Sequence, residues 1–152
     1  MTPNPNRRPA WLPAISLYLV MQALAGCGSL MHPRAGEFLQ QATGANAVDT
    51  QINLIRMMQG SIEAARGQGD FEPSLDTLHN QLYALKKAGC QVGEDQAATV
   101  AYAKASTLGR EVRTIFHQLW KVKNDPSLRD MHLDLMATRL QEMREALQAV
   151  KT

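Results

Sequence analysis

VAYAKASTLGREVRTIFHQLWKV, residues 100–122, contains a sustained apolar repeat. The apolar positions alternate between spacings of four and three residues: Ala101, Ala105, Leu108, Val112, Ile115, Leu119 and Val122. Such a repeat is typical of helices that pack nearly parallel or antiparallel to their neighbours. We therefore predict one long helix over about 94–123, whose acidic first turn and basic last turn both suit the helix dipole.

Three further segments show helical spacing of apolar residues. They cover about 49–66, 73–88 and 126–150. Gly67 and Gly89 are expected to end the first two helices, because glycine is favoured just beyond a helix. Asp125 is a predicted N-cap, and Pro126 suits the first position of the last helix.

Leucines and methionines give the second and last predicted helices an apolar stripe each. These are Leu75, Leu78, Leu82 and Leu85, then Leu133, Met136, Leu140, Met143, Leu147 and Val150. Leu128, Met131 and Leu135 are expected to widen the last stripe. Gly60 lies inside the first helix, where glycine is unfavourable, so it indicates a close backbone approach or a kink.

The predicted fold is all-α. No stretch alternates apolar and polar residues as a half-buried strand would. Helices joined by short loops lie antiparallel to one another. We therefore expect an antiparallel four-helix bundle as a single domain over residues 48–152.

The N-terminus carries Arg7 and Arg8, then an apolar run from Trp11 to Ala25, as in a secretory signal. This run is shorter than the roughly 20 apolar residues that span a membrane. Leu24-Ala25-Gly26-Cys27 follows, and it resembles the lipobox of bacterial lipoproteins. The resemblance implies cleavage between Gly26 and Cys27, with residues 1–26 removed, and a lipid on the Cys27 sulfur.

The residue after the lipidated cysteine influences sorting in this class, and here it is Gly28, which favours the outer membrane. The membrane is thus an expected partner through the lipid anchor at Cys27, with the rest of the chain facing the periplasm. Residues 27–47 mix Gly, Pro, Ala and polar residues without a sustained period, apart from a short helical piece near 37–41. We expect them to form the lipidated N-terminus and a flexible tether.

Processing would also change the charge of the chain. Sixteen basic residues less Arg7 and Arg8 leave fourteen, which equal the fourteen acidic residues. A neutral domain lacks the basic surface that binds nucleic acid, so no nucleic-acid partner is expected. Cys90 would be the remaining thiol. We expect it to be buried as a small apolar residue; the alternative is a disulfide with another chain or with a small thiol.

Motifs of hydrolases, nucleotide-binding proteins and redox enzymes are absent from the sequence, so we expect no enzyme and no catalytic residue. Met131, His132 and Met136 lie within six residues and could ligate copper or haem, and Asp76 precedes His79 by three positions. We interpret the first group as core packing and the second as a solvated flank, and expect no metal and no cofactor.

Phe116 and Trp120 are spaced to share one face of a helix. Such aromatics widen a core, or form an exposed patch that binds a partner. Our leading hypothesis is a lipid-anchored protein-interaction or accessory module of the cell envelope, serving assembly, secretion or conjugation, or inhibition. The alternatives are a bundle that binds haem, copper or a small apolar molecule, and a structural lipoprotein that self-associates.

Overall fold

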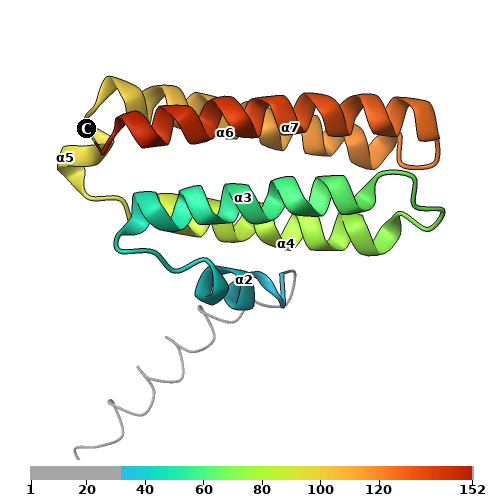
Figure 1. The fold of residues 1–152 in the computed structure, drawn as a ribbon, viewed down its shortest axis with the longest axis horizontal. Coiled ribbons are helices and arrows are strands. Elements are labelled where there is room, and N and C mark those ends of the chain that lie inside the picture. Colours follow the sequence, from blue (N-terminus) through green and yellow to red (C-terminus); the bar gives the residue numbers. More distant parts are fainter. Residues whose placement is uncertain (1–31, 152) are drawn as a thin grey trace, which may run out of the picture. The chain divides into compact units, whose positions relative to one another are not determined.

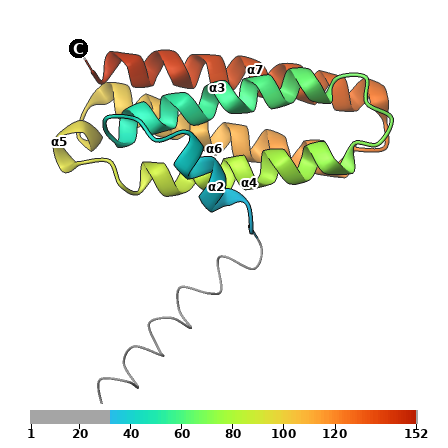
Figure 2. The same cartoon turned by 60° about the horizontal axis from the view of Figure 1, so that its bottom comes forward.

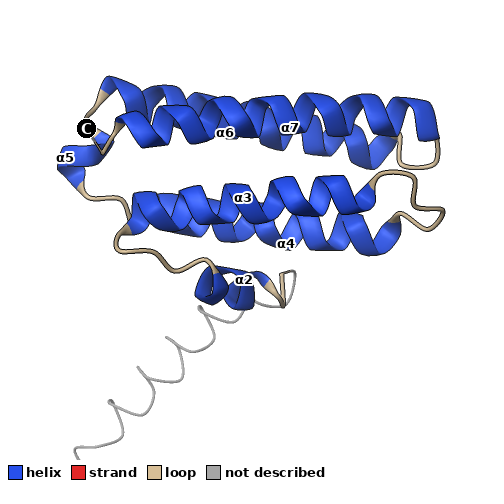
Figure 3. Cartoon of the chain, in the orientation of Figure 1, coloured by secondary structure: helices blue, strands red, loops and turns tan. Residues whose placement is uncertain are grey.

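The computed structural model describes residues 32–151, and every regular element in that range is a helix (Figure 3). The helices are α2 (Ala35–Gln41), α3 (Ala47–Ala65), α4 (Glu72–Gly89), α5 (Glu94–Ala97), α6 (Val100–Lys121) and α7 (Pro126–Ala149). The prediction of an all-α fold is therefore confirmed. Within residues 32–151, no helix combines the length and the apolar character needed to cross a membrane.

The long helices run alongside one another within the compact unit from Arg34 to Thr152 (Figures 1 and 2). Helix α3 packs against α4 and α7, and α6 packs extensively against α7. Helix α2 packs mainly on α4. In contrast, the backbones of α4 and α6 come close to each other at few points, so these two helices are joined mainly through side chains.

The predicted apolar stripes form the core. All four leucines of the α4 stripe are buried, and so are Leu133, Met136, Leu140, Met143 and Leu147 of α7. Both features predicted for the start of the last helix are also confirmed. Pro126 is the first residue of α7. Asp125 is its N-cap, because its side chain accepts a hydrogen bond from the Leu128 N–H at 3.1 Å. Gly67 ends α3 with a φ of 69°, a left-handed conformation that glycine adopts without steric cost.

The single long helix predicted over about 94–123 is wrong at its start. The chain forms the short helix α5 and then begins α6 at Val100. Thr99 has an extended backbone, and its hydroxyl accepts the Tyr102 N–H at 3.1 Å. A threonine N-cap of this kind ends the preceding turn and starts a new helix. The spacing of apolar residues alone does not reveal such a break between two helices.

Part of the expected tether is instead packed into the domain. Ala35, Phe38 and Ala42 are buried. The Arg34 N–H donates to the buried Asn80 side chain on α4 at 3.1 Å. The compact unit that contains the helices therefore begins at Arg34 and includes α2.

One smaller prediction is also wrong. Leu128, Met131 and Leu135 do not widen the core, because they are 41%, 54% and 43% exposed. They follow a second stripe of α7, rotated away from the buried one. For Gly60, one of the two predicted explanations is excluded: a methyl group there would meet no described atom within 4 Å outside the backbone of its own helix, so no other segment approaches it closely.

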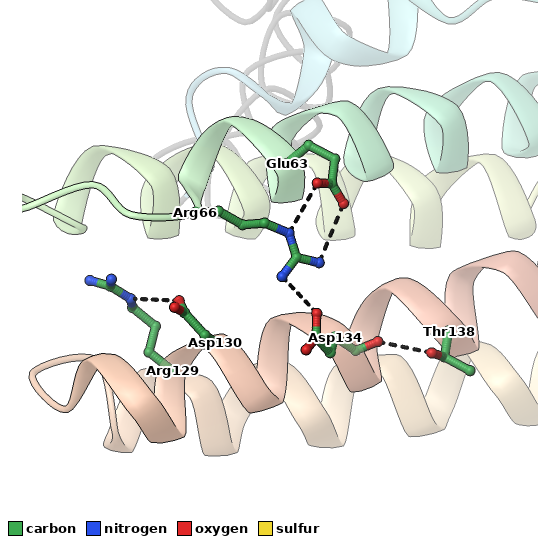
Figure 4. A network of polar contacts seen from close by, with 6 residues as sticks. All are labelled: Glu63, Arg66, Arg129, Asp130, Asp134 and Thr138. Atoms are coloured by element: carbon green, nitrogen blue, oxygen red, sulfur yellow. Dashed lines mark hydrogen bonds and ion pairs between the residues drawn. The ribbon is translucent and has the colours of Figure 1, made fainter.

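Polar contacts join α3 and its following loop to α7 (Figure 4). The Arg66 guanidinium pairs with Glu63 at 3.0 Å and with Asp134 of α7 at 2.6 Å. Hydrogen bonds from the Arg66 guanidinium to these carboxylates, first to Glu63 and then to Asp134, raise the pKa of Arg66. Arg129 is buried, donates to the Gln68 carbonyl at 3.0 Å and lies 4.9 Å from the Phe71 ring. Arg129 thus fixes the α3–α4 loop against the start of α7.

Candidate functional site

An aromatic cluster of His79, Phe116 and Trp120 joins α4 to α6. The rings of His79 and Phe116 stack with their centroids 5.5 Å apart, and Trp120 meets Phe116 edge-on at 5.9 Å. Phe116 is 3% exposed, whereas Trp120 is 41% exposed. One of the two predicted patch residues therefore belongs to the core, and the other reaches the surface above it.

Trp120 is held in place on several sides. His79 lies edge-on to it at 5.7 Å, and the Lys123 ammonium group lies 5.7 Å from its ring. Lys123 in turn forms an ion pair with Glu72 at the start of α4. An exposed tryptophan that is already immobilised loses little side-chain entropy when it contacts another molecule.

The contribution of His79 to this cluster was missed by the sequence analysis, which placed it on a solvated flank. His79 is four residues after Leu75 and three before Leu82. Those helical spacings place it beside the leucine stripe, facing the next helix. That spacing is the signal that could have found it.

A cavity of about 210 Å³ lies further along α4 and α6. We call it the α4–α6 cavity. Its wall includes Leu82 and Leu85 of α4, Gln51 of α3 and Met143 of α7. At one end the Tyr102 hydroxyl donates to the Gly89 carbonyl at 3.1 Å, which ties α6 to the end of α4.

Gln51 lines this cavity with a buried side chain that lacks one hydrogen bond. Its side chain is 4% exposed, and its Oε1 has no hydrogen-bond partner among the described residues. Glycine at position 89 makes room for it, because a Cβ there would lie 3.1 Å from the Gln51 Nε2. Burial raises the pKa of the neighbouring Tyr102 above 10.0, an effect that a hydrogen bond with Gln51 opposes.

The charged residues that line the cavity are both basic. They are Lys86 and Arg113, and no acidic residue lines it in the described part of the chain. Cys90 also lies on its wall and is exposed, so the prediction of a buried thiol is wrong. Cys90 follows the last residue of α4, where the backbone leaves the core.

The methionines and histidine weighed as ligands for copper or haem do not converge. Met136 is fully buried, whereas Met131 is 54% exposed. The Nδ1 atom of His132 lies 2.7 Å from the Leu128 carbonyl of its own helix. Between residues 32 and 151, no three His, Cys, Asp or Glu side chains are grouped so that they could hold a metal ion.

The predicted lipobox, the cleavage site after Gly26 and the lipidation site Cys27 lie outside the described residues. Comparison of the chain with protein families, curated proteins and solved structures finds no match.

Proposed function

We propose that this protein is a lipid-anchored module of the bacterial envelope that binds another protein through Trp120. In this proposal Cys27 carries the lipid at the outer membrane, and an antiparallel four-helix bundle presents the binding surface to the periplasm. The observation that carries the proposal is the exposure of Trp120 above the buried ring of Phe116. Residues at the centre of protein interfaces are enriched in tryptophan that is rigidly held and becomes fully desolvated on binding.

The surroundings of Trp120 support the same function. Lys123 and Glu72 place one positive and one negative charge beside the ring. A polar rim around an apolar centre is the usual anatomy of a protein interface. The partner we expect therefore offers an apolar pocket for the indole ring, bordered by polar groups.

Support for the anchor comes from the sequence of the N-terminus. Leu24-Ala25-Gly26-Cys27 stands after a basic N-terminus and an apolar run, the order found in lipoprotein signals. Several acyl chains on one residue hold a protein at a membrane durably, since each buried methylene contributes about 0.8 kcal/mol. An anchored module of this kind keeps its binding surface close to envelope partners.

The test is site-specific photo-crosslinking in living bacteria. A photo-reactive amino acid replaces exposed Lys121, next to Trp120, or exposed Val100 at the far end of α6. We expect one dominant adduct from position 121 and not from position 100. The adduct should disappear in Trp120→Ala and persist in Leu128→Ala, a matched control because both side chains are 41% exposed.

Three outcomes would contradict the proposal. One is an adduct that persists at full yield in Trp120→Ala. Another is an adduct formed only from position 100. The third is an adduct between two copies of this chain, which would support the self-associating structural lipoprotein instead.

A further inference from the structure

The α4–α6 cavity has chemically different ends, which its lining residues define. At one end the Tyr102 hydroxyl donates to the Gly89 carbonyl, and Gln51 lies beside this contact. Arg113 lines the cavity eleven residues after Tyr102 on α6 and therefore lies toward the other end.

The size of the cavity limits what can enter it. A cavity of about 150 Å³ with apolar walls accommodates benzene. The α4–α6 cavity, at about 210 Å³, therefore has room for one aromatic ring or a short acyl chain with small substituents. The apolar wall that such a ring or acyl chain would contact is formed by Leu82, Leu85 and Met143.

The Arg113 end favours an anion. Arg113 and Lys86 line the cavity, and neither forms an ion pair with any residue of the described part. Arginine binds a carboxylate with two parallel hydrogen bonds, which gives both affinity and orientation. A ligand with a carboxylate at this end would neutralise the local positive charge.

The Gln51 end lacks a hydrogen-bond donor. A buried carbonyl oxygen without a partner costs free energy, and a ligand that donates to it recovers that cost. The Gln51 side chain is more than nine-tenths buried, and its Oε1 is the unpartnered atom. A hydroxyl or amide N–H on the ligand would satisfy it.

We propose that the α4–α6 cavity is a binding site for a small carboxylate that has an aromatic or short acyl body and a hydrogen-bond donor at its other end. The carboxylate lies at Arg113, the body lies against Leu82 and Leu85, and the donor meets Gln51. This site is separate from Trp120 and does not depend on the protein partner proposed above. It also differs from the metal or haem site that the histidines first suggested.

The test uses 4-hydroxyphenylacetate as the probe, because it carries a carboxylate, a ring and a hydroxyl donor. Saturation-transfer NMR measures its binding to envelope vesicles that contain the full-length protein. Maleimide labelling, followed at the Cys90 peptide by mass spectrometry, locates the bound probe, since Cys90 lies on the cavity wall. Because bound probe would cover Cys90, we expect maleimide to label Cys90 about tenfold more slowly than in protein without probe, when the probe is at about ten times its dissociation constant.

Variants and related probes separate the two ends of the site. Arg113→Gln should abolish the saturable signal, whereas Arg110→Gln, a change of an exposed arginine outside the cavity, should preserve it. Phenylacetate lacks the hydroxyl and should bind about fivefold more weakly than the probe, because the Gln51 carbonyl stays unpaired. In Gln51→Met, which has no such acceptor, the two compounds should bind equally.

Several results would overturn this assignment. Equal signals from vesicles with wild-type protein, Arg113→Gln protein or no protein would show nonspecific uptake. Saturable binding that leaves the rate of Cys90 labelling unchanged would place the probe elsewhere. A preference for the hydroxylated probe that survives in Gln51→Met would remove Gln51 from the site.

Discussion

Gly44 and Gly60 differ in what a methyl group would meet. At Gly44, between α2 and α3, a Cβ would lie 2.5 Å from the Asp49 Cβ and 2.9 Å from the Asp49 carbonyl carbon. At Gly60, inside α3, no described atom lies within 4 Å of the added Cβ. The two positions therefore predict opposite effects of the same substitution.

We expect Gly44→Ala to lower the free energy of unfolding by about 1–3 kcal/mol, because the backbone of α3 must move away. Gly60→Ala should raise it by about 0.5–1 kcal/mol through better helix propensity. Urea unfolding of residues 27–152 with Cys27→Ser, followed by circular dichroism, measures both values. A stabilising Gly44→Ala would show that the α2–α3 connection is not closely packed.

Tyr102 predicts a specific dependence of stability on pH. Its folded pKa is raised above 10.0, first by burial. A group with a raised folded pKa stabilises the fold below its unfolded pKa, and this contribution is lost as the pH rises through the folded value. Tyr102 should therefore contribute fully below about pH 10 and progressively less above it.

Comparison with Tyr102→Phe isolates this effect from other titrating groups. At neutral pH the variant should be less stable by about 1 kcal/mol, because the hydrogen bond to Gly89 is lost. The difference in unfolding free energy between the two proteins should shrink above pH 10.0, the usual tyrosine pKa. A difference that stays constant across that range would contradict the raised pKa that partial burial gives Tyr102.

At the scale of the elements, Arg129 joins α7 to the α3–α4 loop. Arg129→Lys keeps the charge but loses the planar guanidinium that reaches the Gln68 carbonyl and the Phe71 ring. We expect this variant to lose about 1–3 kcal/mol of unfolding free energy. Hydrogen exchange, measured by mass spectrometry, should become faster in residues 66–71.

Arg56→Lys is the matched control for that experiment. Arg56 is exposed and donates to Asn53 of its own helix. Exposed substitutions of this kind change stability by about 0.5 kcal/mol or less. If both variants leave exchange in the loop unchanged, Arg129 does not hold the loop.

The sequence predicted the elements unevenly, and the reasons are physical. The long helices follow from apolar periodicity, because burial of one face repeats every three or four residues. The short helical piece predicted near 37–41 corresponds to α2, Ala35–Gln41. The packing of α2 on α4 escaped prediction, since it depends on a distant contact, from Arg34 to Asn80, and not on a repeat. The burial of Arg129 escaped for the same reason, because its partners lie in a loop 61 residues away along the chain.

The candidate sites were predicted less completely than the helices. Spacing placed Phe116 and Trp120 on one face, but it could not tell which side chain is covered by α4. The α4–α6 cavity requires Gln51, Gly89 and Tyr102 from three helices to lie together. No local pattern indicates such a meeting, since each residue is ordinary in its own segment.

At the scale of the whole molecule, the proposal combines a lipid anchor with a helical domain. The charge of the chain after residue 26 is formally balanced, so attraction to a charged surface would not hold it at a membrane. In the proposed function, retention at the membrane therefore depends on the lipid at Cys27. The anchor is therefore the feature on which the proposed tethered function depends.

The most direct test is the intact mass and N-terminal peptide of the protein extracted from bacterial envelopes. We predict a chain that begins at Cys27 and carries the mass of a diacylglycerol. Cys27→Ser should lack this added mass, because serine has no sulfur to carry the lipid. A wild-type chain that begins at Met1, or one with an unmodified Cys27, would contradict the account.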